Sequence, residues 1–200
     1  QQMRVLLVGT RQALVERYTN IFLNLGIQPK VLETQIFSII RSLGFSQDDP
    51  TTMIVHIGAE NMQMAVVSQA ELTLALNHKG GGTLLTKTLQ QGVENLDLQQ
   101  AEQYKRTYGI RGEQLQGKIR QVLMPSVNSL TQQIVKTIRF HNNQYAPDQI
   151  KRIVLSGGTA QLPGLIEHLS NASELEVVMA SPFATSKGEI PESNHQAFSI

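Results

Sequence analysis

Cysteine is absent from the 200 residues of this chain. Disulfide bonds and thiolate metal sites are therefore excluded, and the absence fits a reducing compartment. No apolar run approaches the length of a membrane span, and no signal peptide opens the sequence. The formal net charge is only +1, and no cluster of lysine or arginine is interleaved with aromatic residues. Binding to nucleic acid is accordingly not expected.

The histidines lack the spacing that is typical of metal ligands. They are His56, His78, His141, His168 and His195. This pattern gives no support to a metal hydrolase or to a Ser-His-Asp enzyme. We expect His168 to lie at the surface of a helix.

The most informative segment spans residues 153–165. Residues 153–155 are an apolar run suited to a buried strand, and Ser156-Gly157-Gly158 permits a sharp turn. Pro163 suits the first turn of a helix that continues to about residue 169. A strand that ends in paired glycines before a helix can bring backbone N–H groups up to a nucleotide. Steric needs alone also explain such glycines.

Hydrophobic periodicity predicts alternating strands and helices along the rest of the chain. The predicted strands lie at 5–8, 30–32, 53–57, 62–66, 72–76 and 176–179. The predicted helices lie at 12–25, 35–43, 83–91, 98–108 and 113–141, and a loop follows at 142–148. Pro125 should kink or split the longest helix. The three strands between 53 and 76 are expected to pair as an antiparallel meander. The order predicts a two-lobed α/β fold whose mixed sheet is interrupted by a helical insertion.

Four segments carry a resemblance to a known family. They are Val-His-Ile-Gly-Ala-Glu-Asn at 55–61, Gly-Gly-Thr-Leu-Leu-Thr at 81–86, the helix 101–109 with its Ala-Glu-x-x-Lys pattern, and the glycine turn within 155–165. In this order and spacing they resemble the actin-like ATPase superfamily and, within it, the FtsA/PilM group that includes type IV pilus assembly proteins. The resemblance implies an actin-like (ribonuclease H-like) fold. The chain would be a later, partial portion of it, and we expect both ends to be cuts through a larger fold.

The resemblance also implies a division into parts. Residues 1–43 would end the first lobe and include part of a small extra subdomain, which residues 5–32 resemble. Residues 52–82 would be the β-meander of the second lobe, and 83–149 its helical insertion. Residues 150–200 would return to the second lobe with an adenosine motif.

Nine residues are candidates for nucleotide binding by resemblance. They are Gly58, Ala59, Gly81, Gly82, Glu102, Lys105, Gly157, Gly158 and Thr159. Glu102 would accept from ribose hydroxyls, and Lys105 would lie along the sugar or base. Because these two residues are three apart on one helix, a solvated ion pair is an equal alternative. Thr159 has the alternative role of a helix cap, and Gly58-Ala59 that of an ordinary turn.

His56 departs from the family pattern. The family commonly has an aspartate there, which positions a phosphate-bound magnesium ion through water. Magnesium prefers hard oxygen ligands, so an imidazole is a poor substitute. The family's first phosphate loop, Gly-x-Asp-Ile-Gly, is not found in this chain. ATP is therefore a possible ligand, magnesium is doubtful, hydrolysis is expected to be weak or absent, and no catalytic residue is assigned.

The resemblance implies a cytoplasmic scaffold of the type IV pilus, peripheral to the inner membrane through its partners. Its partners would be the N-terminal cytoplasmic tail of a PilN-like protein and other pilus assembly proteins, with self-association possible. An exposed strand edge around residues 5–32 is expected to accept the tail. Three alternatives are an active nucleotide-switched ATPase, an FtsA-like division protein, and an actin-fold sugar or acetate kinase. The last would need a substrate aspartate and a complete phosphate loop, and neither is found.

Overall fold

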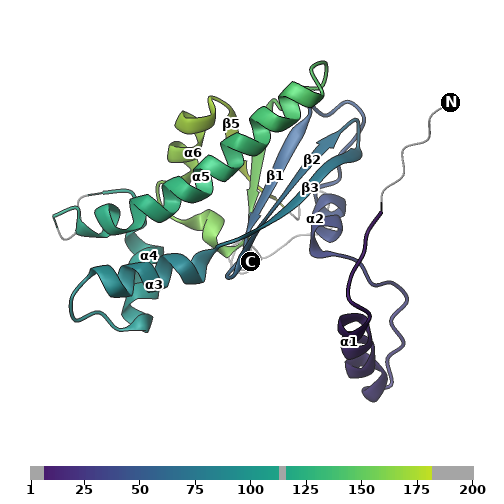
Figure 1. Cartoon of the computed structure of the whole chain (residues 1–200), viewed down its shortest axis with the longest axis horizontal. Coiled ribbons are helices and arrows are strands. Elements are labelled where there is room, and N and C mark those ends of the chain that lie inside the picture. The colour runs from purple at the N-terminus through teal and green to yellow at the C-terminus, as the bar shows by residue number, and fades with distance from the viewer. Residues whose placement is uncertain (1–6, 113–115, 182–200) are drawn as a thin grey trace, which may run out of the picture.

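The computed structural model describes residues 7–112 and 116–181. Six α-helices, five strands and one 3₁₀ turn alternate in this part of the chain (Figure 1). The helices are α1 Gln12–Asn24, α2 Gln35–Leu43, α3 Gly82–Gly92, α4 Leu98–Tyr108, α5 Lys118–Gln144 and α6 Leu165–Ser173. The strands are β1 Thr52–Ile57, β2 Asn61–Ser68, β3 Glu71–Lys79, β4 Arg152–Ser156 and β5 Glu176–Met179, and the 3₁₀ turn η1 is Gly158–Gln161.

The strands form one mixed sheet in the order β3-β2-β1-β4-β5. The predicted meander is confirmed, because β1, β2 and β3 pair antiparallel. The chain then leaves the sheet through α3, α4 and α5 and returns in β4, which pairs parallel with β1, so that His56 lies opposite Ser156. Because β1 and β4 run in the same direction, the hairpin after β1 and the glycine turn after β4 meet at one edge of the sheet.

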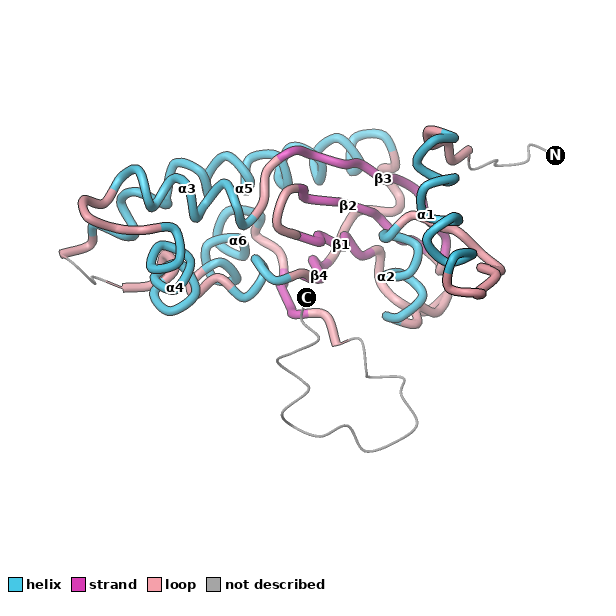
Figure 2. Tube along the Cα trace, turned by 90° about the horizontal axis from the view of Figure 1, so that it is seen from below, coloured by secondary structure: helices cyan, strands magenta, loops and turns pink. Residues whose placement is uncertain are grey.

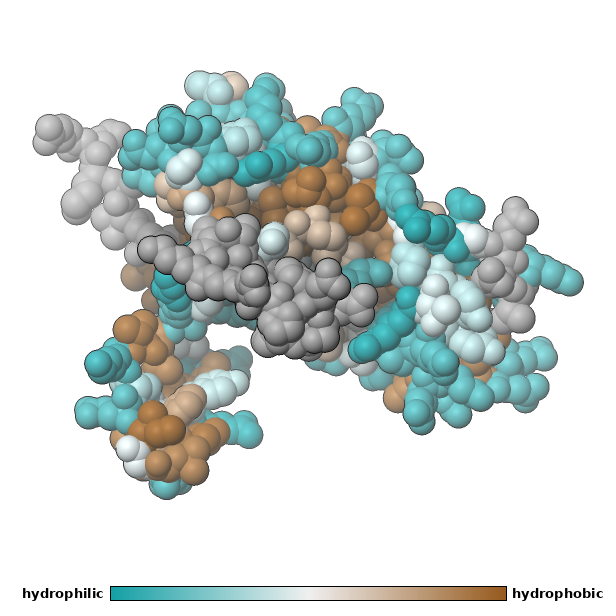
Figure 3. Space-filling model, turned by 180° about the vertical axis from the view of Figure 1, so that it is seen from behind, coloured by the Kyte–Doolittle hydropathy of each residue, from teal (hydrophilic) through white to brown (hydrophobic). Residues whose placement is uncertain are grey.

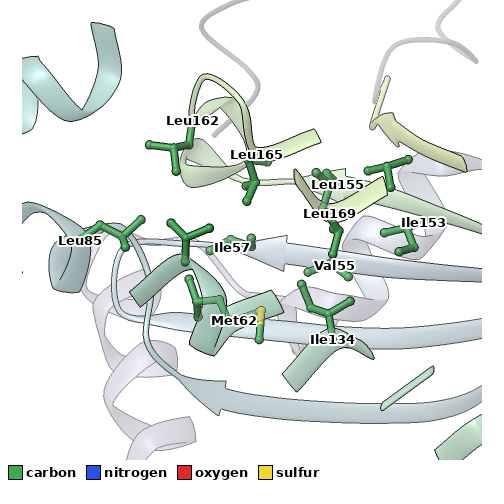
Figure 4. Packing of buried hydrophobic residues seen from close by; sticks show 14 of the residues in the cluster. Val55, Ile57, Met62, Leu85, Ile134, Ile153, Leu155, Leu162, Leu165 and Leu169 are labelled. Carbon is green, nitrogen blue, oxygen red and sulfur yellow. The ribbon is translucent and has the colours of Figure 1, made fainter. Parts of the chain in front are cut away.

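Helices cover both faces of this sheet. Alternate residues of β1 point to opposite faces, as the period of a strand requires. The side chains of Val55 and Ile57 pack among those of Ile134 on α5 and of Leu165 and Leu169 on α6 (Figure 4). On the other face, Ile54 joins a smaller cluster with the residues of α2 (Figure 2). This two-sided burial explains why β1 is an almost continuous apolar run.

The segment before α2 differs from the sequence prediction. Helix α1 forms as predicted but has no buried residue, and Figure 3 shows apolar side chains in brown on the lobe that it forms. The exposed large hydrophobic residues of α1 and of the residue after it include Leu14, Tyr18, Ile21 and Leu25. The predicted strand at 30–32 is wrong, since residues 30–32 adopt irregular structure, as do residues 7 and 8. The remainder of the predicted strand 5–8 lies outside the described residues. A strand needs a neighbour for its backbone hydrogen bonds, and none of the described strands pairs with this segment.

Helix α5 passes through Pro125 without interruption. Of the two effects predicted for this proline, a kink or a split, the split is therefore wrong. Leu123 and Val127, on either side, are completely buried. Burial of these side chains offsets the hydrogen bond that proline removes. The helix also begins at Lys118 and ends at Gln144, so the loop expected from residue 142 starts three residues later.

The turn after β4 is more elaborate than expected. A 3₁₀ turn at Gly158–Gln161 precedes the helix, which begins at Leu165 rather than at Pro163 and ends at Ser173. His168 on this helix is half-buried, and its Nε2 is buried without a hydrogen-bond partner among the described residues. His168 is therefore only partly at the surface. Within the described part of the chain, none of the helices combines the length and apolar character needed to cross a bilayer.

Candidate nucleotide site

A cavity of about 880 Å³ opens where β1 and β4 end. Seven of the nine candidate residues line it, and they come from four separate segments of the chain. They are Gly58, Ala59, Gly82, Glu102, Lys105, Gly158 and Thr159. The remaining two, Gly81 and Gly157, are buried behind this lining. The fold therefore assembles in one place the residues that the sequence suggested from separate motifs.

The glycine pair before α3 allows two backbones to touch. The Gly82 N–H donates to the Gly58 carbonyl at 2.9 Å, and the Thr83 N–H donates to the Ala59 carbonyl at 2.9 Å. A Cβ on Gly81 would lie 2.4 Å from the Gly58 oxygen, which is too close for any other residue. The first N–H groups of α3 are thus bound to the hairpin, whereas the first N–H groups of a helix usually have no partner within it.

The turn after β4 is bound to the same hairpin. Gly157 has a φ of 91°, and it packs against the backbone of Ile57. Thr159 is 6% exposed, and its Oγ1 donates to the Gly58 carbonyl at 3.1 Å. The alternative that Thr159 caps the following helix is wrong, because the N-cap residues of η1 and α6 are Gly157 and Gly164 and neither helix has a side-chain cap. Thr159 instead joins the two turns that form this wall of the cavity.

Lys105 and Glu102 form a partly buried ion pair on α4. Asp97 begins this helix with a capping box, in which its side chain accepts from the Gln100 N–H. Lys105 is only 6% exposed, and its Nζ lies 2.6 Å from Glu102 Oε2. Arg106, which is exposed, donates through Nε to Glu102 Oε1 at 2.7 Å. The predicted ion pair is therefore present, but on the Lys105 side it is not solvated.

The carboxyl of Glu102 is held in its ionised form. Burial raises the pKa of Glu102, but hydrogen bonds from Lys105, Thr86 and Arg106 outweigh this effect and lower it to about 2, against an ordinary value of 4.5. A lowered pKa in the folded state contributes stability above the ordinary value, and that contribution is lost as the pH falls through the folded value. Glu102 therefore favours folding at neutral pH and loses this effect between pH 4.5 and about 2.

We expect the free energy of unfolding at pH 7 to be lower in Glu102→Gln than in the wild type. This difference should become smaller as the pH falls toward 2. The glutamine leaves the buried ammonium of Lys105 without a charged partner, at a cost of about 1–3 kcal/mol. Urea unfolding at several pH values measures this difference. Glu94→Gln, an exposed carboxylate between α3 and α4, is the matched control. A pH-independent difference between Glu102→Gln and the wild type would contradict the expectation.

His56 occupies the end of β1 as a buried, neutral side chain. It is 5% exposed, and burial lowers the pKa of His56 below its ordinary 6.5. Its Nε2 lies 3.1 Å from Gln35 Nε2, and its Nδ1 lies 3.3 Å from Ser156 Oγ. Because the amide nitrogen of Gln35 can only donate, Nε2 accepts and Nδ1 carries the proton. Both ring nitrogens are thus already used.

The residues at this position do not fit a magnesium site. Among the described residues, no group of three His, Asp or Glu side chains could hold a metal ion. The imidazole of His56 also offers no free lone pair, since Gln35 donates to it. The hard oxygen ligands that magnesium requires are not assembled at the strand end.

Eight further lining residues were not among the nine candidates, although Glu60 was expected near the phosphates and Asn61, Thr83 and Arg106 lie within the quoted motifs. They are Gln35, Glu60, Asn61, Gln63, Thr83, Arg106, Gln161 and Leu162. Arg106 could have been found, because it is four residues after Glu102 on the same helix. Gln35 gave no signal, since it lies 21 residues before His56 and the fold alone brings them together.

Solved structures share this fold. A structure described as "PilM-PilN type IV pilus biogenesis complex" superposes with a TM-score of 0.79 at 22% identity, over 94% of this chain and 54% of that chain. The ethanolamine utilization protein EutJ from Carboxydothermus hydrogenoformans superposes with a TM-score of 0.67 at 22% identity, over 86% of this chain and 57% of that chain. MreB 5 of Spiroplasma citri, bound to AMPPNP, superposes with a TM-score of 0.71 at 15% identity, over 96% of this chain and 64% of that chain. The chain therefore spans less than two thirds of each of these proteins, and the likeness identifies an actin-like fold.

The family is shown by the sequence itself. Residues 1–196 match the family described as type IV pilus assembly protein PilM. This match confirms the resemblance and favours it over the FtsA-like alternative. The chain belongs to the PilM family of type IV pilus assembly proteins.

Proposed function

We propose that this chain contributes most of one nucleotide-binding lobe to a type IV pilus scaffold, and that the cavity at the ends of β1 and β4 holds an adenine nucleotide. The observation that carries this proposal is the convergence of seven candidate residues on one cavity. The similar fold of MreB 5, which is described as bound to AMPPNP, supports the choice of ligand. In this proposal residues 1–43 end the first lobe, and residues 52–200 form the second with its helical insertion at 83–149.

Hydrolysis in this proposal is weak or absent. The buried His56 stands where the family commonly has a carboxylate, and it is bound to Gln35 and Ser156 on both sides. Efficient phosphoryl transfer depends on metal ions that neutralise charge on the phosphates. A neutral imidazole does not position such an ion. The site is therefore suited to retaining a nucleotide rather than to turning it over.

The proposed partner is the cytoplasmic tail of a PilN-like membrane protein, through which the scaffold would lie at the inner membrane. The similar fold of a solved PilM-PilN type IV pilus biogenesis complex supports this partner. The proposed docking by strand addition is not supported near residues 30–32, because no strand forms there. The exposed apolar side chains of α1 offer a surface in the same segment instead. Contacts with other pilus assembly proteins and self-association belong to the same proposal.

Calorimetric titration of the protein at its full natural length with ADP and ATP tests the nucleotide site. We expect both to bind, with dissociation constants that change by less than about threefold, or about 0.7 kcal/mol, when magnesium is replaced by EDTA. A tenfold or larger requirement for magnesium would support the active, nucleotide-switched ATPase instead. If neither ADP nor ATP binds, the chain is a scaffold without a nucleotide, and the proposal is refuted.

A further inference from the structure

A second hollow lies between α5 and α6, apart from the candidate nucleotide site. These two helices pack against each other on one face of the sheet (Figure 1). The hollow has a volume of about 430 Å³ and shares no lining residue with the cavity at the strand ends. We call it the α5–α6 groove. Its lining residues are Thr131, Gln132, Val135, Lys136 and Arg139 of α5 and Ala172 of α6.

The charged side chains of α5 are all positive. Its 27 residues include Lys118, Arg120, Lys136 and Arg139, and no aspartate or glutamate. The whole chain has 17 lysines and arginines against 16 aspartates and glutamates, so composition alone does not explain this segregation. Cations stabilise a helix through its dipole only near the last turn, and Lys136 and Arg139 lie before it. The positive charge at the groove therefore has no explanation within the helix.

The two cations of the groove have no acidic partner in the described part of the chain. Neither Lys136 nor Arg139 belongs to any of the ion pairs found there. Glu167, the only carboxylate within α6, is paired with Arg111 instead. Because Lys136 and Arg139 are three residues apart, they lie on the same side of α5. An acidic group that enters the groove would therefore meet two free cations.

The hydroxyl of Thr131 also lacks a partner. Thr131 is 5% exposed, and its Oγ1 is buried without a hydrogen bond to any described residue. Thr137, on the same helix, instead donates to the Gln133 carbonyl at 2.9 Å. A buried hydroxyl without a partner is unfavourable. The groove thus brings together two cations and an unsatisfied hydroxyl, and all of them can donate to a carboxylate.

We propose that the α5–α6 groove docks an acidic peptide segment of a partner protein. A carboxylate of the peptide pairs with Lys136 and Arg139, and an apolar side chain of the peptide packs against Val135 and Ala172. Arg139 is suited to this role, since a guanidinium binds a carboxylate through two parallel hydrogen bonds. This surface is separate from the candidate nucleotide site, so the proposal does not depend on nucleotide binding.

The apolar surface beside the cations favours a peptide over a small anion. Phe140 is 55% exposed and lies one turn after Lys136, so the apolar surface extends beyond the groove. A peptide can cover this surface, whereas a phosphate ion cannot. Nucleic acid requires several phosphate contacts at once, and anionic membranes are attracted by clusters of about four to eight cations. Only two cations line the groove, which favours a short peptide over either of them.

Selection of a random heptapeptide library on the full-length protein tests the proposal. Phage that bind elsewhere are first removed on the double variant Lys136→Gln, Arg139→Gln. Enriched peptides should combine acidic residues with a leucine or an aromatic residue. In fluorescence polarisation they should bind the double variant about tenfold more weakly than the wild type. The matched control is Lys118→Gln, Arg120→Gln, which removes two exposed cations of the same helix outside the groove and should change affinity less than about twofold.

Two neighbouring positions on α6 separate the groove from the general charge of the protein. Ala172 lines the groove, whereas Asn171 does not, and both are exposed. Ala172→Glu places a carboxylate among the two cations and should lower affinity for the enriched peptides about tenfold. Asn171→Glu makes the same change in charge one residue away and should leave affinity within about twofold. Circular dichroism of each variant verifies that it is folded.

Several outcomes would overturn the proposal. One is a library that yields no enriched peptide or only peptides without acidic residues. Another is equal loss of affinity in the two double variants or in the two glutamate variants, since the attraction would then be general. The last is binding of oligothymidylate, or of vesicles that contain phosphatidylglycerol, as tight as that of the enriched peptides and equally sensitive to Lys136→Gln, Arg139→Gln. The groove would then recognise phosphate-bearing polymers or membranes rather than a peptide.

Discussion

Gly157→Ala is expected to lower the free energy of unfolding by about 3 kcal/mol. Gly157 has φ 91° and ψ 160°, a combination that is essentially open only to glycine. Its Cβ would also lie 2.5 Å from the carbonyl oxygen of Ile57 and 3.0 Å from its nitrogen. These neighbours are backbone atoms of a central, fully buried strand, so they cannot move aside cheaply. Strain and collision therefore act together at this position.

The adjacent glycine provides the matched control. Gly158 has no positive φ, and a Cβ there would meet no atom within 4 Å. Gly158→Ala should change stability by less than about 1 kcal/mol, although it narrows the cavity that Gly158 lines. Urea unfolding followed by circular dichroism measures both variants. Similar losses at the two positions would show that the tight packing of Gly157 against Ile57 does not determine the stability of this turn.

These two glycines show how far the sequence could predict the fold. The apolar run 153–155 followed by Ser-Gly-Gly is a local pattern, and the strand and sharp turn that it predicts are confirmed. The meander was equally predictable, because alternation along each strand reports which face is buried. The seven candidate residues that line one cavity came from spaced motifs rather than from any single signal.

What the sequence did not reveal depends on long-range contacts. The burial of Lys105 follows from where α3 packs against α4, and no periodicity in residues 98–108 reports it. The strand expected at 30–32 was inferred from a local pattern, which does not provide a pairing partner. Pro125 was expected to kink or split α5, but the helix is not split, and the buried neighbours of the proline belong to the tertiary core. Packing overrode local propensity in α5, whereas the segment 30–32 has no neighbouring strand to pair with among the described residues.

His56→Asp is expected to make nucleotide binding depend on magnesium. In the wild type the neutral imidazole has both nitrogens engaged, so ADP affinity should be nearly the same with magnesium and with EDTA. An aspartate at the end of β1 would supply the hard, charged oxygen that a water-coordinated magnesium ion prefers. We expect ADP to bind about tenfold more tightly with magnesium than with EDTA in this variant, which corresponds to about 1.4 kcal/mol.

The His56→Asp variant is also expected to lose stability, and this loss must be separated from the gain in magnesium-dependent ADP affinity. The aspartate would be buried at a position where the histidine is 5% exposed, although Gln35 and Ser156 are placed to donate to it. His56→Asn is the matched control, because it removes the imidazole and has the shape of aspartate without its charge. It should share the loss of packing and show no magnesium dependence.

Two outcomes would contradict the expectation that charge at position 56 governs magnesium binding. One is an asparagine variant that gains the same magnesium dependence, and the other is a wild type whose ADP affinity already falls tenfold in EDTA. If neither variant responds to magnesium, the carboxylate alone is insufficient, and the departure at His56 does not by itself explain the expected weak hydrolysis.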